Sequence, residues 1–126
     1  MKILVVDDQP KMRAAIASTL VRKLKGPLAL YECANGMDAV KRYQELMPDW
    51  TLMDIEMEPV DGITAARTIL GLDPKAKIIL VTQYDEPGFR AVAKEIGICG
   101  FVCKTNLVGV IDVIGREDLD NPLTIP

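Results

Sequence analysis

A short apolar segment followed by a helical pattern occurs five times in succession along the chain. The five apolar segments are predicted strands, namely Ile3–Val6, Leu28–Cys33, Trp50–Met53, Lys77–Val81 and Ile98–Cys103. Three of them are almost continuously apolar, which is typical of strands covered by helices on both faces. Regular alternation of strand and helix indicates a parallel sheet with right-handed connections. The pattern therefore predicts an α/β fold built on a doubly wound five-stranded parallel sheet.

The segments between the strands carry residues that are typical of helix starts. Pro10 stands where the first turn of a helix tolerates proline. Asn35 and Asp61 can cap a second and a third helix, and Pro87 begins a fourth. A fifth helix is predicted from apolar residues at the spacing of one helical face, namely Leu107, Val110, Ile111 and Ile114.

Length and composition limit the possible functions of the chain. Its 126 residues suit one domain, predicted over residues 1–116, with a polar tail or the start of a linker at 117–126. The formal net charge of −3 disfavours direct nucleic-acid binding, which usually needs a basic patch. No apolar segment approaches the roughly 20 residues that cross a bilayer, and the apolar start is too short for a signal peptide. We therefore expect a cytoplasmic protein that does not bind membranes.

Polar or charged residues directly follow four of the five predicted strands. Asp7 and Asp8 follow the first strand, Asp54 the third, Thr82 the fourth and Lys104 the fifth. The carboxyl ends of parallel strands share one edge of the sheet, where α/β proteins bind their ligands. We therefore expect three carboxylates, one hydroxyl and one ammonium to meet at a single site.

The chemistry of this group of residues points to phosphoryl transfer. Three neighbouring carboxylates repel one another unless a cation is bound, and oxygen ligands favour Mg²⁺ over zinc. Lys104 and Thr82 can contact phosphoryl oxygens, which leaves Asp54 as a carboxylate nucleophile that forms an acyl phosphate. The chain contains no histidine, so a phosphohistidine donor must belong to a partner.

Taken together, the motifs resemble the receiver domain of response regulators. The matching segments run in order from residue 2 to about 116, namely Ile3–Asp8, Leu52–Met57, Asp61-Gly62, Val81-Thr82 and Gly100–Lys104. The resemblance implies a flavodoxin-like (βα)5 fold with strand order 2-1-3-4-5. It also implies a phosphorylation-dependent signalling switch whose partner is a sensor histidine kinase or a phosphotransfer protein.

The resemblance assigns roles at the site residue by residue. Asp54 is the implied phosphoacceptor and Lys104 the lysine that contacts the phosphoryl group. Asp7, Asp8 and Asp54 are the implied carboxylate ligands of Mg²⁺, and Glu56 matches the position whose backbone carbonyl completes the metal site. Autodephosphorylation is the only further reaction expected, so the chain is not predicted to be an enzyme.

Residues beyond the metal site are expected to control the signal. Thr82 and Phe101 match the switch pair of the family. Glu56 and Tyr84 lie two residues past Asp54 and Thr82, so we expect them to flank the path of the attacking water and to tune dephosphorylation.

The predicted output surface comprises the fourth helix, the fifth strand and the fifth helix. Val108 and Val113 are predicted to lie off the core face of the last helix. A homodimer through helices four and five, or docking of an output partner, is therefore expected.

The chain departs from the family pattern at two positions. Glu58 stands where proline usually follows the motif's methionine, and Pro59 comes one residue later. Thr105 stands where proline usually follows the site lysine. A cis bond between Lys104 and Thr105 would cost about 3–4 kcal/mol without proline, so the sequence leaves the geometry of this loop open.

Two other functions are compatible with a fold of this class. An Asp-nucleophile phosphotransferase or phosphatase would need Asp-x-Asp, but Glu56 occupies the second position; steady turnover would indicate this alternative. A flavin- or nucleotide-binding protein would need a Gly-rich or Ser/Thr-rich loop after the first strand. The segment Asp7–Pro10 has the opposite charge, so we exclude this second alternative.

Overall fold

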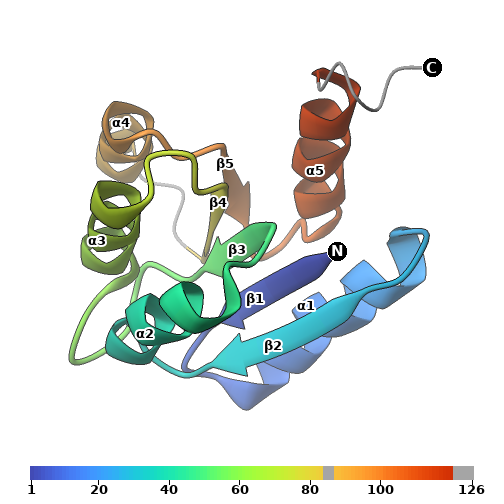
Figure 1. The fold of residues 1–126 in the computed structure, drawn as a ribbon, viewed down its shortest axis with the longest axis horizontal. Coiled ribbons are helices and arrows are strands. Elements are labelled where there is room, and N and C mark those ends of the chain that lie inside the picture. The colour runs from blue at the N-terminus through green and yellow to red at the C-terminus, as the bar shows by residue number, and fades with distance from the viewer. Residues whose placement is uncertain (84–86, 121–126) are drawn as a thin grey trace.

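The computed structural model describes residues 1–83 and 87–120, with side chains up to residue 116. Within these ranges five strands alternate with five helices (Figure 1). The strands are β1 (Lys2–Val6), β2 (Ala29–Cys33), β3 (Trp50–Met53), β4 (Ile78–Thr82) and β5 (Gly100–Cys103). The helices are α1 (Pro10–Lys23), α2 (Gly36–Leu46), α3 (Gly62–Leu72), α4 (Pro87–Ile96) and α5 (Val108–Asp120). All ten predicted elements are present, and the strand ends differ from the predicted ones by at most two residues.

The five strands form one parallel sheet with the order β2-β1-β3-β4-β5. The predicted doubly wound, flavodoxin-like arrangement is therefore confirmed. The direction of winding reverses between β1 and β3, which are neighbours in the sheet. In sheets of this kind, the crevice beyond the carboxyl ends of the strands at that reversal is the usual ligand site.

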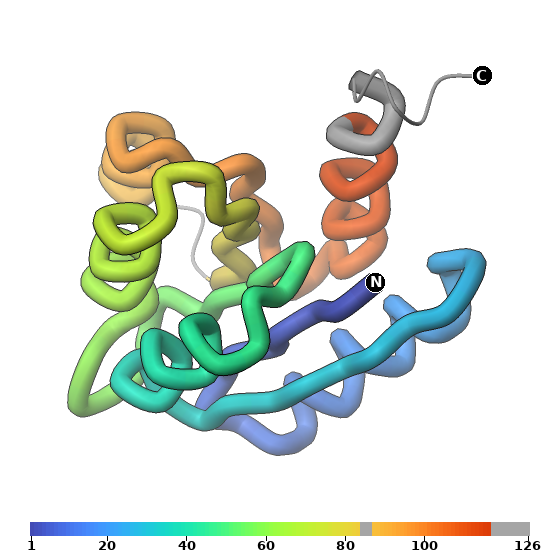
Figure 2. Tube along the Cα trace, in the orientation of Figure 1, coloured from blue at the N-terminus to red at the C-terminus, as the bar shows by residue number. Residues whose placement is uncertain are grey.

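Each face of the sheet is covered by its own group of helices. Helices α1 and α5 lie on one face, and α2, α3 and α4 lie on the other (Figures 1 and 2). Along β1, Ile3 and Val5 pack in the core layer beneath α1 and α5, while Leu4 and Val6 pack in the layer beneath α2, α3 and α4. All four residues are at most 1% exposed. Because successive side chains of a strand point to opposite faces, a strand buried on both faces is apolar at every position.

The predicted helix starts are confirmed. Pro10 occupies the first turn of α1. The side chain of Asn35 accepts a 2.9 Å hydrogen bond from the Asp38 amide, and that of Asp61 accepts one of 2.8 Å from the Thr64 amide. These bonds satisfy amides that have no partner inside the helix. None of the helices in the described ranges is long and apolar enough to cross a bilayer.

The prediction for α5 was wrong at Val113. This residue is 5% exposed and packs in the core, whereas Val108 is 48% exposed as expected. The reason lies on β5, where a Cβ at Gly100 would be 2.8 Å from both methyl groups of Val113. The valine therefore fills the space above a residue without a side chain. The helix also continues beyond the predicted domain boundary at residue 116, and residues 121–126 of the predicted tail lie outside the described ranges.

Candidate functional site

Backbone hydrogen bonds align the residues that follow the strands. The amide of Asp54 donates to the carbonyl of Val6 at 2.9 Å, and the amide of Lys104 donates to the carbonyl of Thr82 at 2.7 Å. These bonds continue the sheet ladder one residue past β3 and β5. They place Asp7, Asp54, Thr82 and Lys104 along one edge of the sheet, next to the reversal between β1 and β3.

Three carboxylates meet at this edge, as the sequence predicts. One carboxylate oxygen from each of Asp7, Asp8 and Asp54 lies within 4.8 Å of the other two. Asp7 is fully buried and Asp54 is 4% exposed, while Asp8 is exposed to solvent. The cluster thus has two carboxylates inside the protein and one at the surface.

Lys104 is the cation that faces these carboxylates. Its Nζ lies 2.8 Å from Oδ2 of Asp7 and 3.3 Å from Oδ2 of Asp54, and its side chain is 8% exposed. Burial lowers the pKa of Lys104, but the hydrogen bond to Asp7 and the charges of Asp54 and Asp7 outweigh it, so the pKa is raised overall. Lys104 therefore stays charged and offsets one of the three negative charges.

The pKa of the Asp54 carboxyl is raised to about 6, and burial is the largest cause. Within this balance the Lys104 ammonium lowers the pKa and the charge of Asp7 raises it. Oδ2 of Asp7 is buried and has no hydrogen bond of suitable geometry, although it forms the ion pair with Lys104. A set of carboxylate oxygens with excess negative charge fits a hard divalent cation such as Mg²⁺.

A small polar pocket of about 130 Å³ opens above Asp54. Its lining is entirely polar or charged and comprises Asp8, Gln9, Asp54, Glu56, Thr82, Gln83 and Lys104. Thr82 is 1% exposed, whereas Glu56 is exposed at the rim. The pocket thus brings the Asp54 carboxylate, a hydroxyl and an ammonium to one polar space.

Phe101 lies outside this pocket. It is partly buried against the core layer of α2, α3 and α4, and the Arg90 guanidinium carbon lies 4.7 Å from the centre of its ring.

Two other sequence predictions concern the loops at this edge of the sheet. Tyr84, which the sequence assigns to dephosphorylation, lies outside the described residues. Across the described ranges the one cis peptide bond is Glu58–Pro59, so the bond between Lys104 and Thr105 is trans.

Two residues support the site in ways that sequence reasoning missed. Gly62 was matched only as part of a motif, yet a Cβ at this position would overlap the carbonyl oxygen of Asp54. The glycine lets the start of α3 pack directly against the backbone of Asp54. Arg13 donates from Nη1 to the carbonyl of Asp7 at 2.7 Å. A single arginine on an amphipathic helix gives no pattern from which this bond could be predicted.

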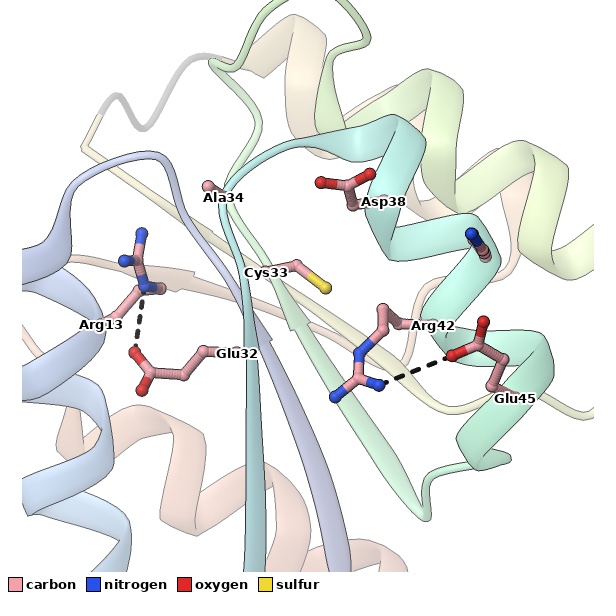
Figure 3. Close-up of a pocket in the computed structure, with 8 residues that line it drawn as sticks. Arg13, Glu32, Cys33, Ala34, Asp38, Arg42 and Glu45 are labelled. Carbon is pink, nitrogen blue, oxygen red and sulfur yellow. Dashed lines mark hydrogen bonds and ion pairs between the residues drawn. The ribbon is translucent and has the colours of Figure 1, made fainter.

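A larger groove of about 410 Å³ lies between α1, β2 and α2 (Figure 3). It is lined by Arg13, Glu32, Cys33, Ala34, Asp38, Lys41, Arg42 and Glu45. Cations and anions are balanced there, with ion pairs from Arg13 to Glu32 and from Arg42 to Glu45. Burial raises the pKa of the Cys33 thiol, which favours its protonated form. The groove is larger than the pocket above Asp54, but none of the three clustered aspartates lines it. The smaller pocket is therefore the candidate functional site.

Comparisons with known proteins agree with this arrangement. The chain matches the response regulator receiver domain over residues 3–112. The chemotaxis protein CheY of Bacillus subtilis (strain 168) is 37% identical over 103 residues, which is 82% of this chain and 84% of that protein. The phosphatase or phosphotransferase alternative is not favoured by these relatives.

Solved structures share the fold. The response regulator domain of Thermotoga maritima CheB superimposes with a TM-score of 0.82 and 25% identity, over 92% of this chain and 94% of that one. A chain of the CheX–CheY–BeF3–Mg²⁺ complex from Borrelia burgdorferi gives a TM-score of 0.84 at 21% identity, over 93% and 88% of the two chains. With its family match over most of its length, its strand order and its cluster of three aspartates, the chain belongs to the response regulator receiver domain family.

Proposed function

We propose that Asp54 is the phosphoacceptor of this receiver domain. The observation that carries the proposal is the position of its carboxylate, which is 4% exposed, opens into a small polar pocket and lies 3.3 Å from the Lys104 ammonium. The donor is a phosphohistidine on a sensor histidine kinase or a phosphotransfer protein, since this chain has no histidine. The proposed site of action is the cytoplasm, without direct contact to nucleic acid or membrane.

The transfer step follows from this geometry. One oxygen of the Asp54 carboxylate attacks the phosphorus atom as the bond between phosphorus and the donor's imidazole nitrogen breaks, and that nitrogen keeps the electron pair. The product is an acyl phosphate on Asp54 and a free histidine on the partner. Lys104 contacts one phosphoryl oxygen and the Thr82 hydroxyl donates to another, so the protein supplies position and positive charge.

We propose that Asp7, Asp8, Asp54 and the backbone carbonyl of Glu56 hold one Mg²⁺. The excess negative charge of the carboxylate cluster supports this assignment. When bound, the ion would supply positive charge that stabilises the negative charge of the transferred phosphoryl group. The CheY–CheX structure of Borrelia burgdorferi contains Mg²⁺ and beryllofluoride, which makes the same two reagents suitable probes here.

The proposed output is a change in the surface of α4, β5 and α5. Thr82 senses the phosphoryl group and Phe101 responds to it, while Glu56 at the pocket rim influences the approach of water and hence the lifetime of the phosphate. The Tyr84 part of this proposal lies outside the described residues. A homodimer through α4 and α5 is the proposed consequence if this surface meets a second copy of the chain. Of the two valines predicted to lie on it, Val108 is exposed and Val113 is buried.

The test is phosphorylation of the purified protein by acetyl phosphate with Mg²⁺. Intact-mass analysis should show the addition of a single phosphoryl group that hydroxylamine removes. Asp54→Asn should abolish this addition, because the amide is not a nucleophile. Asp112→Asn, a change at an exposed aspartate on α5, is the matched control and should be phosphorylated like the wild type.

Two results would contradict the proposal. A mass gain that persists in the Asp54→Asn protein would place the phosphate on another residue. Steady release of phosphate from a phosphomonoester over many turnovers would instead indicate the phosphatase alternative. A stoichiometric phosphoprotein that slowly loses its phosphate is the expected result.

A further inference from the structure

Asp7 is held in place at four points. Its amide donates to the carbonyl of Cys33 at 3.1 Å, and its Oδ1 accepts a 2.9 Å bond from the amide of Gln9. Its Oδ2 forms the ion pair with Lys104 at 2.8 Å, and its carbonyl oxygen accepts from Nη1 of Arg13 at 2.7 Å. In the function proposed above, Lys104 turns toward the phosphoryl group, so the three other bonds must hold the residue at that moment.

The bond from Arg13 acts on a particular part of the backbone. The Asp7 carbonyl belongs to the peptide unit that joins Asp7 to Asp8, and this unit is planar. Fixing the carbonyl therefore fixes the plane between the two carboxylates of the proposed metal site. Asp8 is exposed, so burial does not hold its side chain in place. The orientation of this peptide plane therefore sets the direction in which the Asp8 side chain leaves the backbone.

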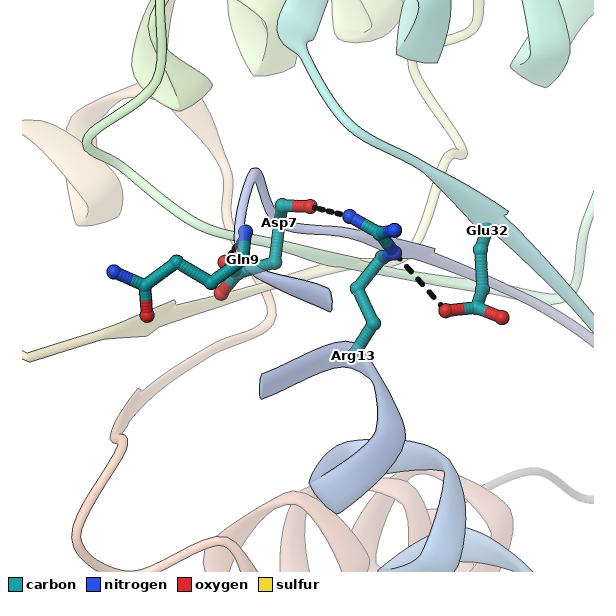
Figure 4. A network of polar contacts seen from close by, with 4 residues as sticks. All are labelled: Asp7, Gln9, Arg13 and Glu32. Carbon is teal, nitrogen blue, oxygen red and sulfur yellow. Dashed lines mark hydrogen bonds and ion pairs between the residues drawn. The ribbon is translucent and has the colours of Figure 1, made fainter. Parts of the chain in front are cut away.

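Arg13 is itself fixed by a second contact. Its Nε donates to Oε1 of Glu32 on β2 at 3.0 Å, and its side chain is 18% exposed (Figure 4). A guanidinium group is planar, so a bond at Nε restricts the direction in which Nη1 points. Bonds from a charged donor are also stronger than neutral ones. The arginine thus connects α1, the edge strand β2 and the turn after β1.

We propose that Arg13 is a positioning residue for the metal site, which holds the Asp7–Asp8 peptide unit in the orientation that binds Mg²⁺. Glu32 acts through Arg13 by fixing its guanidinium plane. This inference rests on the proposed function, because it presumes that the carboxylate cluster binds Mg²⁺. It adds a residue on α1, and its partner on β2, to the groups that determine the affinity of the site.

The chain offers a matched control for a test. Arg42 lies in the same groove as Arg13 and also forms an ion pair, with Glu45 at 3.5 Å, but it makes no contact with Asp7. Calorimetric Mg²⁺ titration should give a Kd about tenfold higher for Arg13→Ala than for wild type, as is typical when a residue that orients a metal ligand is removed. Arg42→Ala should keep the wild-type Kd. Glu32→Gln should weaken binding in the wild type but not in the Arg13→Ala background.

Two further readouts separate positioning from general destabilisation. The Mg²⁺ concentration that half-saturates phosphorylation by acetyl phosphate should rise in Arg13→Ala, while the rate at saturating Mg²⁺ approaches that of wild type. In the metal-free protein, the Gln9 amide should exchange with solvent faster in Arg13→Ala and at the wild-type rate in Arg42→Ala. If Arg13→Ala does not fold, Arg13→Lys replaces it, because one ammonium cannot hold both contacts in the fork geometry.

The outcomes distinguish this inference from the function on which it rests. Wild-type protein that binds Mg²⁺ together with an Arg13→Ala protein of equal affinity would overturn the role of Arg13 and leave the proposed function intact. Equal losses in Arg13→Ala and Arg42→Ala would also overturn it, since the effect would then not depend on contact with Asp7. Absence of Mg²⁺ binding in the wild type would overturn both.

Discussion

Asp54 is a carboxylate whose ionisation the fold opposes. Because burial raises its pKa from 3.8 to about 6, the folded protein binds more protons than the unfolded chain between these values, so stability falls as pH rises through this window. A shift of about two units corresponds to about 3 kcal/mol, at 1.36 kcal/mol per unit. In the absence of metal, Asp54→Asn should therefore raise the free energy of unfolding at pH 8, by up to this amount. Urea titrations at several pH values measure the difference.

The pH dependence of the Asp54→Asn effect identifies its cause. The gain should shrink as pH falls toward 4, where the native carboxyl is already protonated. Saturating Mg²⁺ should stabilise the wild type more than the variant, because the variant lacks one ligand charge. Asp112→Asn, at an exposed position, should show no such gain at pH 8. An Asp54→Asn protein that is no more stable than wild type at pH 8 would show that the fold does not oppose this charge.

At the scale of elements, one hydrogen bond joins α2 to the end of α3. Oη of Tyr43, a residue that is 3% exposed, donates to Oδ2 of Asp73 at 2.6 Å. Burial and the neighbouring Asp73 carboxylate both raise the pKa of Tyr43, so it remains a donor. Hydrogen bonds to charged groups contribute about 1.5–3 kcal/mol, and Tyr43→Phe should lower the free energy of unfolding by about the lower value because solvent can reach Asp73.

The control for Tyr43→Phe is Tyr31→Phe. The ring of Tyr31 lies 5.6 Å from the Arg42 guanidinium carbon, a contact that phenylalanine retains. The free energy of unfolding of Tyr31→Phe should stay close to that of wild type in urea titrations. Both variants should still be phosphorylated on Asp54. If the two substitutions cost the same, the bond to Asp73 does not hold the helices together.

The elements were predictable because their signals are local. The continuous apolar sequence of β1 and the caps at Asn35 and Asp61 are features of neighbouring residues in the chain, and the structure confirms the elements that they predict. Val113 was misplaced because its burial depends on Gly100 of a different element, and neither residue shows this alone.

The site also has features that the sequence predicts and one that it does not. The convergence of Asp7, Asp8, Asp54 and Lys104 follows from parallel strands having a common edge, so the order of the residues in the sequence was enough to predict it. The bond from Arg13 to the Asp7 carbonyl depends on a rotamer, which no pattern of residue types encodes.

At the scale of the whole molecule, the site is connected to the proposed output surface through two neighbouring strands. Leu80 of β4 pairs with Phe101 of β5, and Thr82 pairs with Cys103. Leu80 and Phe101 belong to the same core layer, and Thr82, two residues past Leu80, points to that side as well. A rotation of the Thr82 hydroxyl toward a phosphoryl oxygen would therefore change the space beside Phe101 and α4. Packed interiors respond to such changes by switching between discrete arrangements.

Beryllofluoride with Mg²⁺, which stands in for the phosphoryl group, should therefore shift the aromatic NMR signals of Phe101. The indole signal of Trp50, a buried residue at the opposite end of β3, should stay in place and serve as the internal reference. In Thr82→Ala the Phe101 shift should be lost although beryllofluoride still binds, because the hydroxyl that links the two events is gone. A full Phe101 shift in that variant would show that the signal does not pass through Thr82.

Sedimentation of the same samples identifies what the changed surface of α4, β5 and α5 binds. Association of the protein when beryllofluoride is added would indicate the homodimer. A protein that stays monomeric would indicate that the partner of this surface is a different protein.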